Sequence, residues 1–157
     1  MKLDSIKLLI LDVDGTLTDG GIYISDDGSQ QKRFSAKDGL GIKMAIEQGI
    51  TVGIISHSHS TLAIETRVRA LGIQKCYIGN RDKLQVLQDW LPELKVQKEN
   101  VAFIGDDLND KNIMLEVAVS ACPADAHHEI KEIAGHVLTK KGGEGCVREF
   151  IDQYLIN

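Results

Sequence analysis

The sequence predicts a doubly wound α/β fold, in which a mostly parallel sheet has helices on both faces and a β-hairpin is inserted after the first strand. Two observations carry this prediction. Apolar, β-branched runs alternate along the chain with segments of helical periodicity, which is the pattern of βαβ units. One segment breaks the alternation: "GIYISDDGSQQKRF", residues 21–34, has two short β-like runs around an Asp-Asp-Gly turn, and this pattern is typical of a hairpin.

The expected strands follow the apolar runs in chain order. The first run contains "LLIL" and is followed by Asp12. An unbroken apolar run of this kind is typical of a strand that is buried on both faces. The predicted strands cover residues 7–12, 51–55, 75–78, 101–104 and, more weakly, 118–121.

Helical periodicity fills the intervals between these strands. Asp38 is a plausible N-cap for the first helix, and Gly49 stands at the C-cap position that would close it. The predicted helices cover residues 39–48, 60–71, 82–91, 108–116, 127–134 and 145–155.

Composition restricts the possible functions. A chain of 157 residues, 43% of them hydrophobic, is expected to form one domain over residues 1–157. The net charge of −5 argues against a nucleic-acid partner, and no apolar run approaches the ~20 residues that cross a bilayer, so we expect no membrane partner. The cysteines are odd in number and widely spaced, and we interpret Cys76, Cys122 and Cys146 as small apolar core residues in a reducing compartment, by default the cytoplasm.

Polar and charged side chains gather where the expected strands end. Because ligands bind beyond the carboxyl ends of the strands in open parallel sheets, these residues are expected to form one site. Several carboxylates at one site repel each other unless a cation is present, and their hard oxygens suit Mg²⁺. A lysine and a hydroxyl beside a metal suit a phosphoryl group. The set comprises Asp12, Asp14, Ser56, Lys83, Asp106, Asp107 and Asp110.

The pair of Asp12 and Asp14 has a spacing that suits aspartyl-phosphate chemistry. Side chains alternate along an extended chain, so the two carboxylates lie on the same side. Asp12 can attack phosphorus once Mg²⁺ lowers the repulsion between two anions, and Asp14 can give a proton to the leaving alcohol and later take one from water. Gly15 allows a tight turn whose backbone N–H groups can face the phosphate oxygens.

These residues resemble the four motifs of the haloacid dehalogenase superfamily of phosphatases. "DVDGTLTDG", which begins at Asp12, resembles motif I, Ser56 motif II, Lys83 motif III and "GDDLND" (105–110) motif IV, in that order. The resemblance implies that Asp12 is the nucleophile and Asp14 the general acid/base. The remaining roles that it implies are Mg²⁺ binding by Asp12, Asp106 and the main-chain carbonyl of Asp14, orientation of the metal and its waters by Asp107 and Asp110, and phosphate binding by Ser56, Lys83 and Gly15.

Other segments resemble the small capless branch of this superfamily. They are the hairpin insertion at about 21–34, "FSAKDGLGIK" (34–43) and "KKGGEGCVREF" (140–150). Members of the branch are tetramers in which hairpins assemble a central barrel and neighbouring subunits complete each site. The resemblance therefore implies a homotetramer without a cap domain and a C-terminal tail, at about 139–157, that closes over the substrate. It also implies substrate contacts from Asp38, Gly39, Lys43, Arg67 and Gly143.

The capless branch acts on phosphorylated keto-deoxy sugar acids, and Lys and Arg near the site suit the carboxylate of such an acid. We expect the substrate to be 3-deoxy-D-manno-octulosonate 8-phosphate, which belongs to lipopolysaccharide biosynthesis. A nine-carbon nonulosonate 9-phosphate of the sialic-acid or KDN type is the alternative. After motif II the branch usually has Gly-Arg or Gly-Glu, a position that helps to select the sugar, whereas this chain reads "SHSHS" (56–60).

Two non-enzymatic classes of protein share some of these features. A phospho-receiver module also clusters aspartates in a small α/β unit, but its acidic pair precedes a phosphoacceptor on a later strand. Here the Asp12/Asp14 pair lies on the first strand and the acidic group at 106–110 comes late. A non-catalytic oligomerisation module usually loses an aspartate of motif I, and both are present. The order and completeness of the motifs therefore favour an enzyme.

Overall fold

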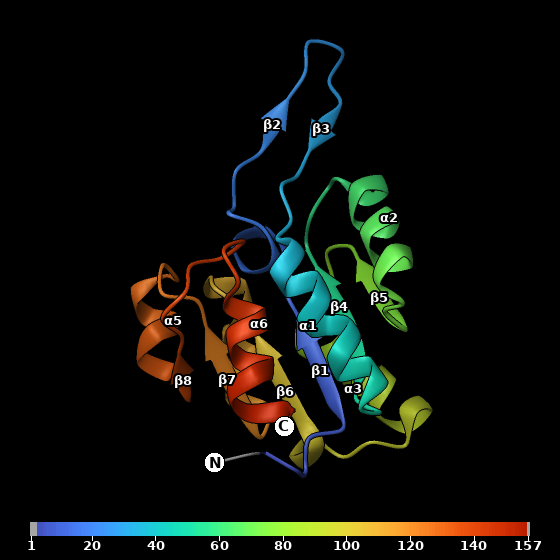
Figure 1. Ribbon diagram of the computed structural model, residues 1–157, viewed down its shortest axis with the longest axis vertical. Helices are drawn as coiled ribbons and strands as arrows, with labels where there is room; N and C mark the ends of the chain where they lie inside the picture. Colours follow the sequence, from blue (N-terminus) through green and yellow to red (C-terminus); the bar gives the residue numbers. More distant parts are fainter. Residues whose placement is uncertain (1–2, 157) are drawn as a thin grey trace.

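The computed structural model describes residues 3–156 and contains a six-stranded parallel sheet in the order β5–β4–β1–β6–β7–β8 (Figure 1). The central strand β1 pairs with β4 on one side and with β6 on the other. The chain therefore leaves β1 toward both edges of the sheet, and ligands bind at such a point of reversal. The strands are β1 (Leu8–Leu11), β4 (Thr51–Ser56), β5 (Lys75–Ile78), β6 (Val101–Ile104), β7 (Val119–Cys122) and β8 (His136–Val137).

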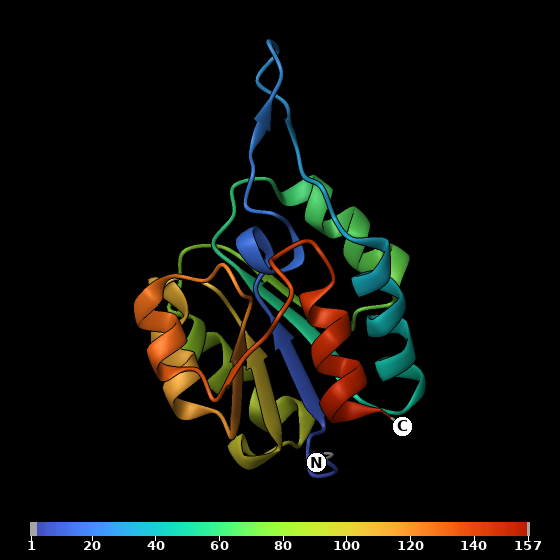
Figure 2. The same ribbon diagram turned by 60° about the vertical axis from the view of Figure 1, so that its left-hand side comes forward.

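Helices cover both faces of this sheet (Figures 1 and 2). Side chains of β1 alternate between two cores: Leu9 and Leu11 pack with α1, α2 and α6, while Leu8 and Ile10 pack with α3, α4 and α5. This alternation explains why the whole run is apolar, and it confirms the predicted doubly wound fold. The helices are α1 (Ala36–Glu47), α2 (Thr61–Leu71), α3 (Lys83–Leu94), α4 (Lys111–Glu116), α5 (His128–Ile133) and α6 (Cys146–Phe150).

The inserted hairpin consists of β2 (Tyr23–Ile24) and β3 (Gln30–Gln31), which pair antiparallel. It extends away from the carboxyl end of the sheet, opposite to the two ends of the chain (Figure 1). Its first strand carries apolar side chains into solvent, since Tyr23 is 53% exposed and Ile24 is 68% exposed. The predicted hairpin is therefore present, with an apolar surface that its own subunit leaves uncovered.

The start of α1 differs from the prediction. The N-cap is Ser35, whose Oγ accepts a hydrogen bond from the backbone N–H of Asp38 at 3.4 Å, and Asp38 lies in the first turn. The prediction of Asp38 as N-cap was wrong. A serine three residues before an acidic residue is itself a helix-start signal, and this signal points to Ser35 as the N-cap. At the other end the C-cap is Gln48, and Gly49 follows it with a φ of 86°.

The prediction for the cysteines holds in part. Cys122 and Cys146 are buried, but Cys76 is exposed. Cys76 lies on β5, the edge strand of the sheet, where the covering layers end. The opposite edge strand, β8, was not predicted because two residues are too short to give an apolar run. Within residues 3–156, no helix has both the length and the apolarity of a membrane span.

Candidate active site

The ends of β1 and β4 and the start of α3 bring polar side chains together inside the protein. Asp12 follows β1, Ser56 ends β4 and Lys83 opens α3. Asp12 is 5% exposed, and Ser56 and Lys83 are each 1% exposed. Charged groups are buried this deeply when they are paired or when they serve a function.

Lys83 connects two of the predicted site residues. Its Nζ lies 2.5 Å from Asp12 Oδ1 and 2.5 Å from Asp110 Oδ1. Burial alone would lower the pKa of Lys83, but the carboxylates of Asp12 and Asp110 outweigh it, so the pKa is raised. The lysine is therefore a fixed positive charge beside the predicted nucleophile.

One ammonium group does not neutralise the acidic groups of this site. Burial, followed by the charges of Asp12 and Asp110, raises the pKa of Asp106 to about 9. Burial and Asp12 raise the pKa of Asp110 to about 6, although Lys83 opposes this change. The arrangement therefore favours the binding of further positive charge.

The donor set fits Mg²⁺. Oxygens of Asp12, Asp106 and Asp110 lie within 4.8 Å of one another, and hard carboxylate oxygens are the ligands that this ion prefers. Both oxygens of Asp110 already accept hydrogen bonds, because Oδ1 binds Lys83 and Oδ2 binds the backbone N–H groups of Asp106 and Asp107 at 2.9 and 3.2 Å. Asp12 and Asp106 are thus the candidate ligands of the ion, and the hydrogen bonds of Asp110 hold the loop.

Asp107, the remaining acidic residue of this loop, is exposed. Its Oδ1 accepts a hydrogen bond from the backbone N–H of Leu108 at 2.7 Å and caps the short turn Leu108–Asp110. Its predicted influence on the metal and its waters stays a prediction.

The turn that follows Asp12 places Gly15 against the loop that carries Asp106. Gly15 has a φ of 91°, and a Cβ on it would lie 2.1 Å from Asp106 Oδ2. Only glycine fits there. The N–H of Gly15 donates to Thr18 Oγ1 at 3.3 Å, so its phosphate contact stays a prediction. Thr16, which the sequence analysis did not single out, donates from Oγ1 to Asp106 Oδ1 at 3.1 Å.

The predicted acid/base residue has a partner from the hairpin. Lys32 Nζ forms an ion pair with Asp14 Oδ1, and the Lys32 side chain is 2% exposed. The sequence analysis missed Lys32. A signal was present, because a hairpin that returns to the first strand must bring its last residues beside the Asp14 loop, and the bridge between Thr18 and Phe34 shows this return.

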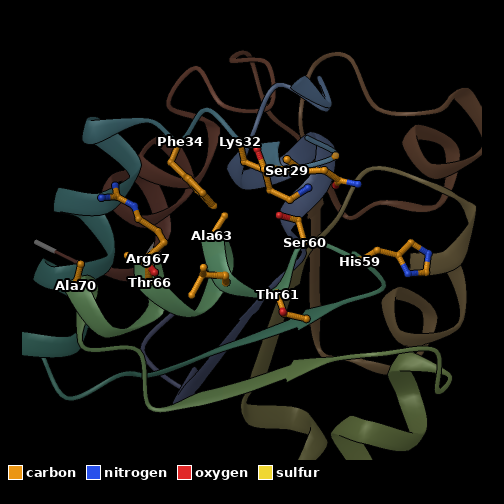
Figure 3. A pocket seen from close by; sticks show the side chains of 13 residues that line it. Ser29, Lys32, Phe34, His59, Ser60, Thr61, Ala63, Thr66, Arg67 and Ala70 are labelled. Carbon is orange, nitrogen blue, oxygen red and sulfur yellow. The ribbon is translucent and has the colours of Figure 1, made fainter. Parts of the chain in front are cut away.

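A cleft of about 710 Å³ lies between the hairpin and α2. Figure 3 shows Lys32 and Phe34 on the hairpin side and Ser60, Ala63 and Arg67 on the other. Since Lys32 also contacts Asp14, the cleft adjoins the predicted acid/base. Among the residues that the structure describes, none that lines this cleft is acidic, and the charged ones are Lys32 and Arg67.

The structure places two of the predicted substrate residues, Gly39 and Lys43, beside a third, Arg67. Arg67 Nη2 donates to the Ser35 carbonyl at 3.1 Å, and its guanidinium lies 5.7 Å from the centre of the Phe34 ring. A Cβ on Gly39 would lie 2.3 Å from Arg67 Nη2, so this glycine gives the arginine its space. Lys43 lines a smaller cavity with Gly39 and Arg67.

Asp38 and Gly143 belong to the attachment of the C-terminal tail. Asp38 is 1% exposed and its Oδ1 accepts a hydrogen bond from the backbone N–H of Arg148 at 2.8 Å. Gly143 donates its N–H to the Thr16 carbonyl at 3.0 Å. The tail thus packs directly on the turn after Asp12. Asp38 anchors this tail within its own subunit, and its predicted contact with substrate stays a prediction.

Comparisons with known proteins agree with this geometry. Residues 77–151 match the family of haloacid dehalogenase-like hydrolases. The chain is 43% identical over 155 residues to the 3-deoxy-D-manno-octulosonate 8-phosphate phosphatase KdsC of Escherichia coli K12, covering 99% of this chain and 82% of that protein.

Solved structures of similar proteins share the fold. The 3-deoxy-D-manno-octulosonate 8-phosphate phosphatase of Yersinia pestis matches with a TM-score of 0.91 and 43% identity, over 94% of this chain and 80% of that one. The Moraxella catarrhalis phosphatase of the same name, in complex with magnesium, phosphate and KDO, matches with a TM-score of 0.92 and 33% identity, over 96% and 86%. The chain therefore belongs to the KdsC family of haloacid dehalogenase-like hydrolases and is a phosphoric monoester hydrolase.

Proposed function

We propose that this chain is a Mg²⁺-dependent phosphatase that hydrolyses 3-deoxy-D-manno-octulosonate 8-phosphate through an aspartyl-phosphate intermediate. The observation that carries the proposal is the position of Asp12 at the end of the central strand, with Lys83 Nζ 2.5 Å from its carboxylate and further acidic oxygens around it. The proposed substrate is the one in the name of the E. coli relative. The M. catarrhalis structure holds magnesium, phosphate and KDO.

The proposed binding of the phosphoryl group uses a metal ion and two side chains that contact the phosphoryl oxygens. Asp12, Asp106 and the main-chain carbonyl of Asp14 would hold Mg²⁺, which supplies the charge that lets an anionic nucleophile approach a phosphate dianion. Lys83 and Ser56 would bind the phosphoryl oxygens, and their burial excludes water from that contact.

The reaction proceeds in two displacements. A carboxylate oxygen of Asp12 attacks phosphorus, the bond from phosphorus to the sugar oxygen breaks, and Asp14 gives its proton to the leaving alkoxide. Water then attacks the phosphorus of the aspartyl-phosphate while Asp14 accepts the proton of that water. Orthophosphate leaves and the Asp12 carboxylate is regenerated.

The cleft between the hairpin and α2 is the proposed place of the sugar. It adjoins Asp14 through Lys32 and carries Arg67 on its other side. A sugar acid presents a carboxylate besides its phosphate, and a cleft with cationic and no acidic lining residues complements that second charge. Lys43, Gly39 and Gly143 are proposed to support this contact from α1 and the tail.

The proposed active particle is a homotetramer of one-domain subunits, spanning residues 1–157, whose hairpins associate. The support is the apolar, exposed first strand of the hairpin, because a strand edge of this kind is normally covered. The cytoplasm is the proposed location, since free thiols such as these cysteines are typical of reducing compartments.

The test is a panel of eight- and nine-carbon keto-acid phosphates, assayed for phosphate release with Mg²⁺. We expect the highest kcat/KM for the octulosonate 8-phosphate, and preference for a nonulosonate 9-phosphate would contradict the assignment of the sugar. The Asp12→Asn variant should lose roughly 10⁴-fold or more in turnover while keeping its fold. A folded Asp12→Asn protein with wild-type turnover would refute the aspartyl-phosphate mechanism.

A further inference from the structure

His57, in the "SHSHS" segment, lies directly after Ser56 at the carboxyl end of β4. Its imidazole makes hydrogen bonds to two other strand-end loops. Nε2 lies 2.8 Å from the main-chain oxygen of Arg81, and Nδ1 lies 3.3 Å from Nδ2 of Asn109. His59, two residues on, is exposed and lines the cleft instead. The two histidines therefore differ in their surroundings.

The partners of His57 determine which ring nitrogen carries the proton. The Arg81 carbonyl can only accept, so Nε2 must donate. In the neutral ring Nδ1 is then an acceptor, and it receives the amide N–H of Asn109. The imidazole thus uses both of its nitrogens to join one loop to another.

The loops that His57 joins carry the phosphate site. Arg81 stands two residues before Lys83, and Asn109 stands directly before Asp110. A second connection lies beside it, because Asn112 Nδ2, on α4 directly after the loop of Asn109, donates to Asp82 Oδ2 at 2.9 Å. Asp82 also accepts from the N–H groups at the start of α3, the helix that begins with Lys83. Because His57 directly follows Ser56, its two hydrogen bonds also tie the end of β4 to these loops.

The loop at 106–110 needs such a restraint for a physical reason. This loop brings oxygens of Asp106 and Asp110 within 4.8 Å of one another and of Asp12, so its position must be held closely for these side chains to serve one site. That loop has an exposed outer side, where Asp107, Leu108 and Asn109 lie. A hydrogen bond on Asn109 therefore restrains the loop where the surrounding packing is thinnest.

We propose that His57 is a positioning residue, which holds the loops of Ser56, Lys83 and Asp110 together so that these side chains meet the phosphoryl group. The proposal rests on the proposed phosphatase function and adds to it a role for a segment that departs from the family pattern. His57 acts through the loops and does not touch the sugar. Its loss should therefore affect every phosphate monoester alike.

The first test reads the imidazole directly in the metal-free protein. In ¹H–¹⁵N spectra of the side chain, His57 should show one neutral tautomer with the proton on Nε2, and Asn109→Ala should shift the Nδ1 resonance. A ring protonated on Nδ1, or one that averages rapidly between tautomers as a solvated imidazole does, would overturn the proposal. This test does not depend on activity.

The second test compares two substrates, an aryl phosphate and the octulosonate phosphate. His57→Ala should lower kcat/KM for both by the same factor, about 10- to 100-fold, as is usual when a group that orients metal-site ligands is removed. It should also weaken inhibition by orthophosphate. His57→Gln, which can donate to Arg81 and accept from Asn109, should recover most of the loss. His128→Ala, which removes an exposed histidine from α5, is the matched control.

The outcomes separate the alternatives. A loss confined to the sugar phosphate would place His57 in the sugar site and overturn the positioning role, as would wild-type kinetics of a folded His57→Ala protein. Failure of the glutamine variant to recover activity while its thermal unfolding matches wild type would also overturn it. A wild-type protein that hydrolyses neither substrate would instead defeat the proposed function, and the tautomer would still decide the placement of His57.

Discussion

Lys32 Nζ pairs with Asp14 Oδ1, so the base of the hairpin is joined to the proposed acid/base within one subunit. The lysine side chain is almost fully buried, and the side chain of Asp14 is 33% exposed. A buried ammonium on a half-open carboxylate fixes the direction in which that carboxylate points. In the proposed mechanism the hairpin therefore acts in the chemistry of its own subunit besides any role in assembly.

Replacing Lys32 by methionine should lower the turnover of sugar phosphates by about 10- to 100-fold, since a hydrogen bond to a charged group contributes a few kcal/mol at most. Lys32→Arg should keep part of the activity because it keeps the charge. Lys7→Met, at the far end of β1, is the matched control. Steady-state kinetics at saturating Mg²⁺ check this, and an unchanged Lys32→Met enzyme would remove the hairpin lysine from the mechanism.

Asp14→Asn should slow hydrolysis of the sugar phosphate by about 10²- to 10⁴-fold, because an amide cannot donate a proton to the leaving alkoxide. The loss should be smaller for an aryl phosphate, whose leaving group needs little protonation. The measurement is the ratio of kcat for the two substrates in wild type and variant. Equal losses for both would argue against the general-acid role of Asp14.

Removal of Mg²⁺ by EDTA should abolish turnover, and added Mg²⁺ should restore it. Binding should also raise the thermal midpoint, because the ion relieves the repulsion that, together with burial, raises the pKa of Asp106 to about 9. Asp106→Asn should lose most of this Mg²⁺-dependent shift. Calorimetry with and without the ion checks the prediction, and full activity after exhaustive chelation would contradict it.

The buried carboxyl group of Asp38 predicts how the free energy of unfolding depends on pH. Burial raises its pKa above the usual 3.8, and its Oδ2 is buried without a hydrogen-bond partner among residues 3–156. Below pH 3.8 the carboxyl is protonated in both states. As the pH rises from there to the folded-state pKa, the unfolded chain releases the proton first, so this group makes the free energy of unfolding fall.

Asp38→Asn keeps an acceptor for the Arg148 N–H and removes this titration. The variant should therefore gain stability relative to wild type as the pH rises above 3.8, and the gain should level off once the folded-state pKa is passed. Urea unfolding at several pH values measures the difference. Parallel curves for the two proteins would show that Asp38 is solvated in the folded state.

The elements of this fold could be predicted wherever a local signal exists. The run at β1 and the motifs at Asp12, Lys83 and Asp106 have local sequence patterns, and the structure places these residues around one acidic centre. The pairs that the sequence did not reveal, such as Lys32 with Asp14, join residues that are distant in the chain. The hairpin pattern indicates that its last residues return beside the Asp14 loop, but no local pattern says which of them reaches Asp14.

The errors have two causes. The N-cap prediction at Asp38 overlooked the local signal of Ser35 three residues earlier, whereas the hydrogen bond from the Arg148 N–H to Asp38 depends on the docking of α6 on α1. Cys76 is apolar enough for a core, but its exposure depends on β5 being an edge strand. Strand order is a property of the assembled sheet.

The last prediction concerns the hairpin as an interface. Ile22, Tyr23 and Ile24 are 58%, 53% and 68% exposed, and apolar side chains on a short strand with an open edge favour association with another copy. A deletion of the hairpin would also remove Lys32, so its effect on assembly could not be separated from its effect on catalysis. Replacing Ile22, Tyr23 and Ile24 by threonine keeps the strand propensity and keeps Lys32.

If the wild type is the proposed tetramer, this triple variant should run as smaller particles in light scattering, because the proposed apolar contact between hairpins is lost. Its turnover of sugar phosphates should fall more than its turnover of a small aryl phosphate, since the aryl substrate needs only the strand-end residues of one subunit. Leu115→Thr, which removes an apolar side chain that is 60% exposed on α4, is the matched control and should leave the particle size unchanged. A monomeric triple variant with full activity on the sugar phosphate would show that each subunit has a complete site, and a triple variant that stays tetrameric would place the interface elsewhere.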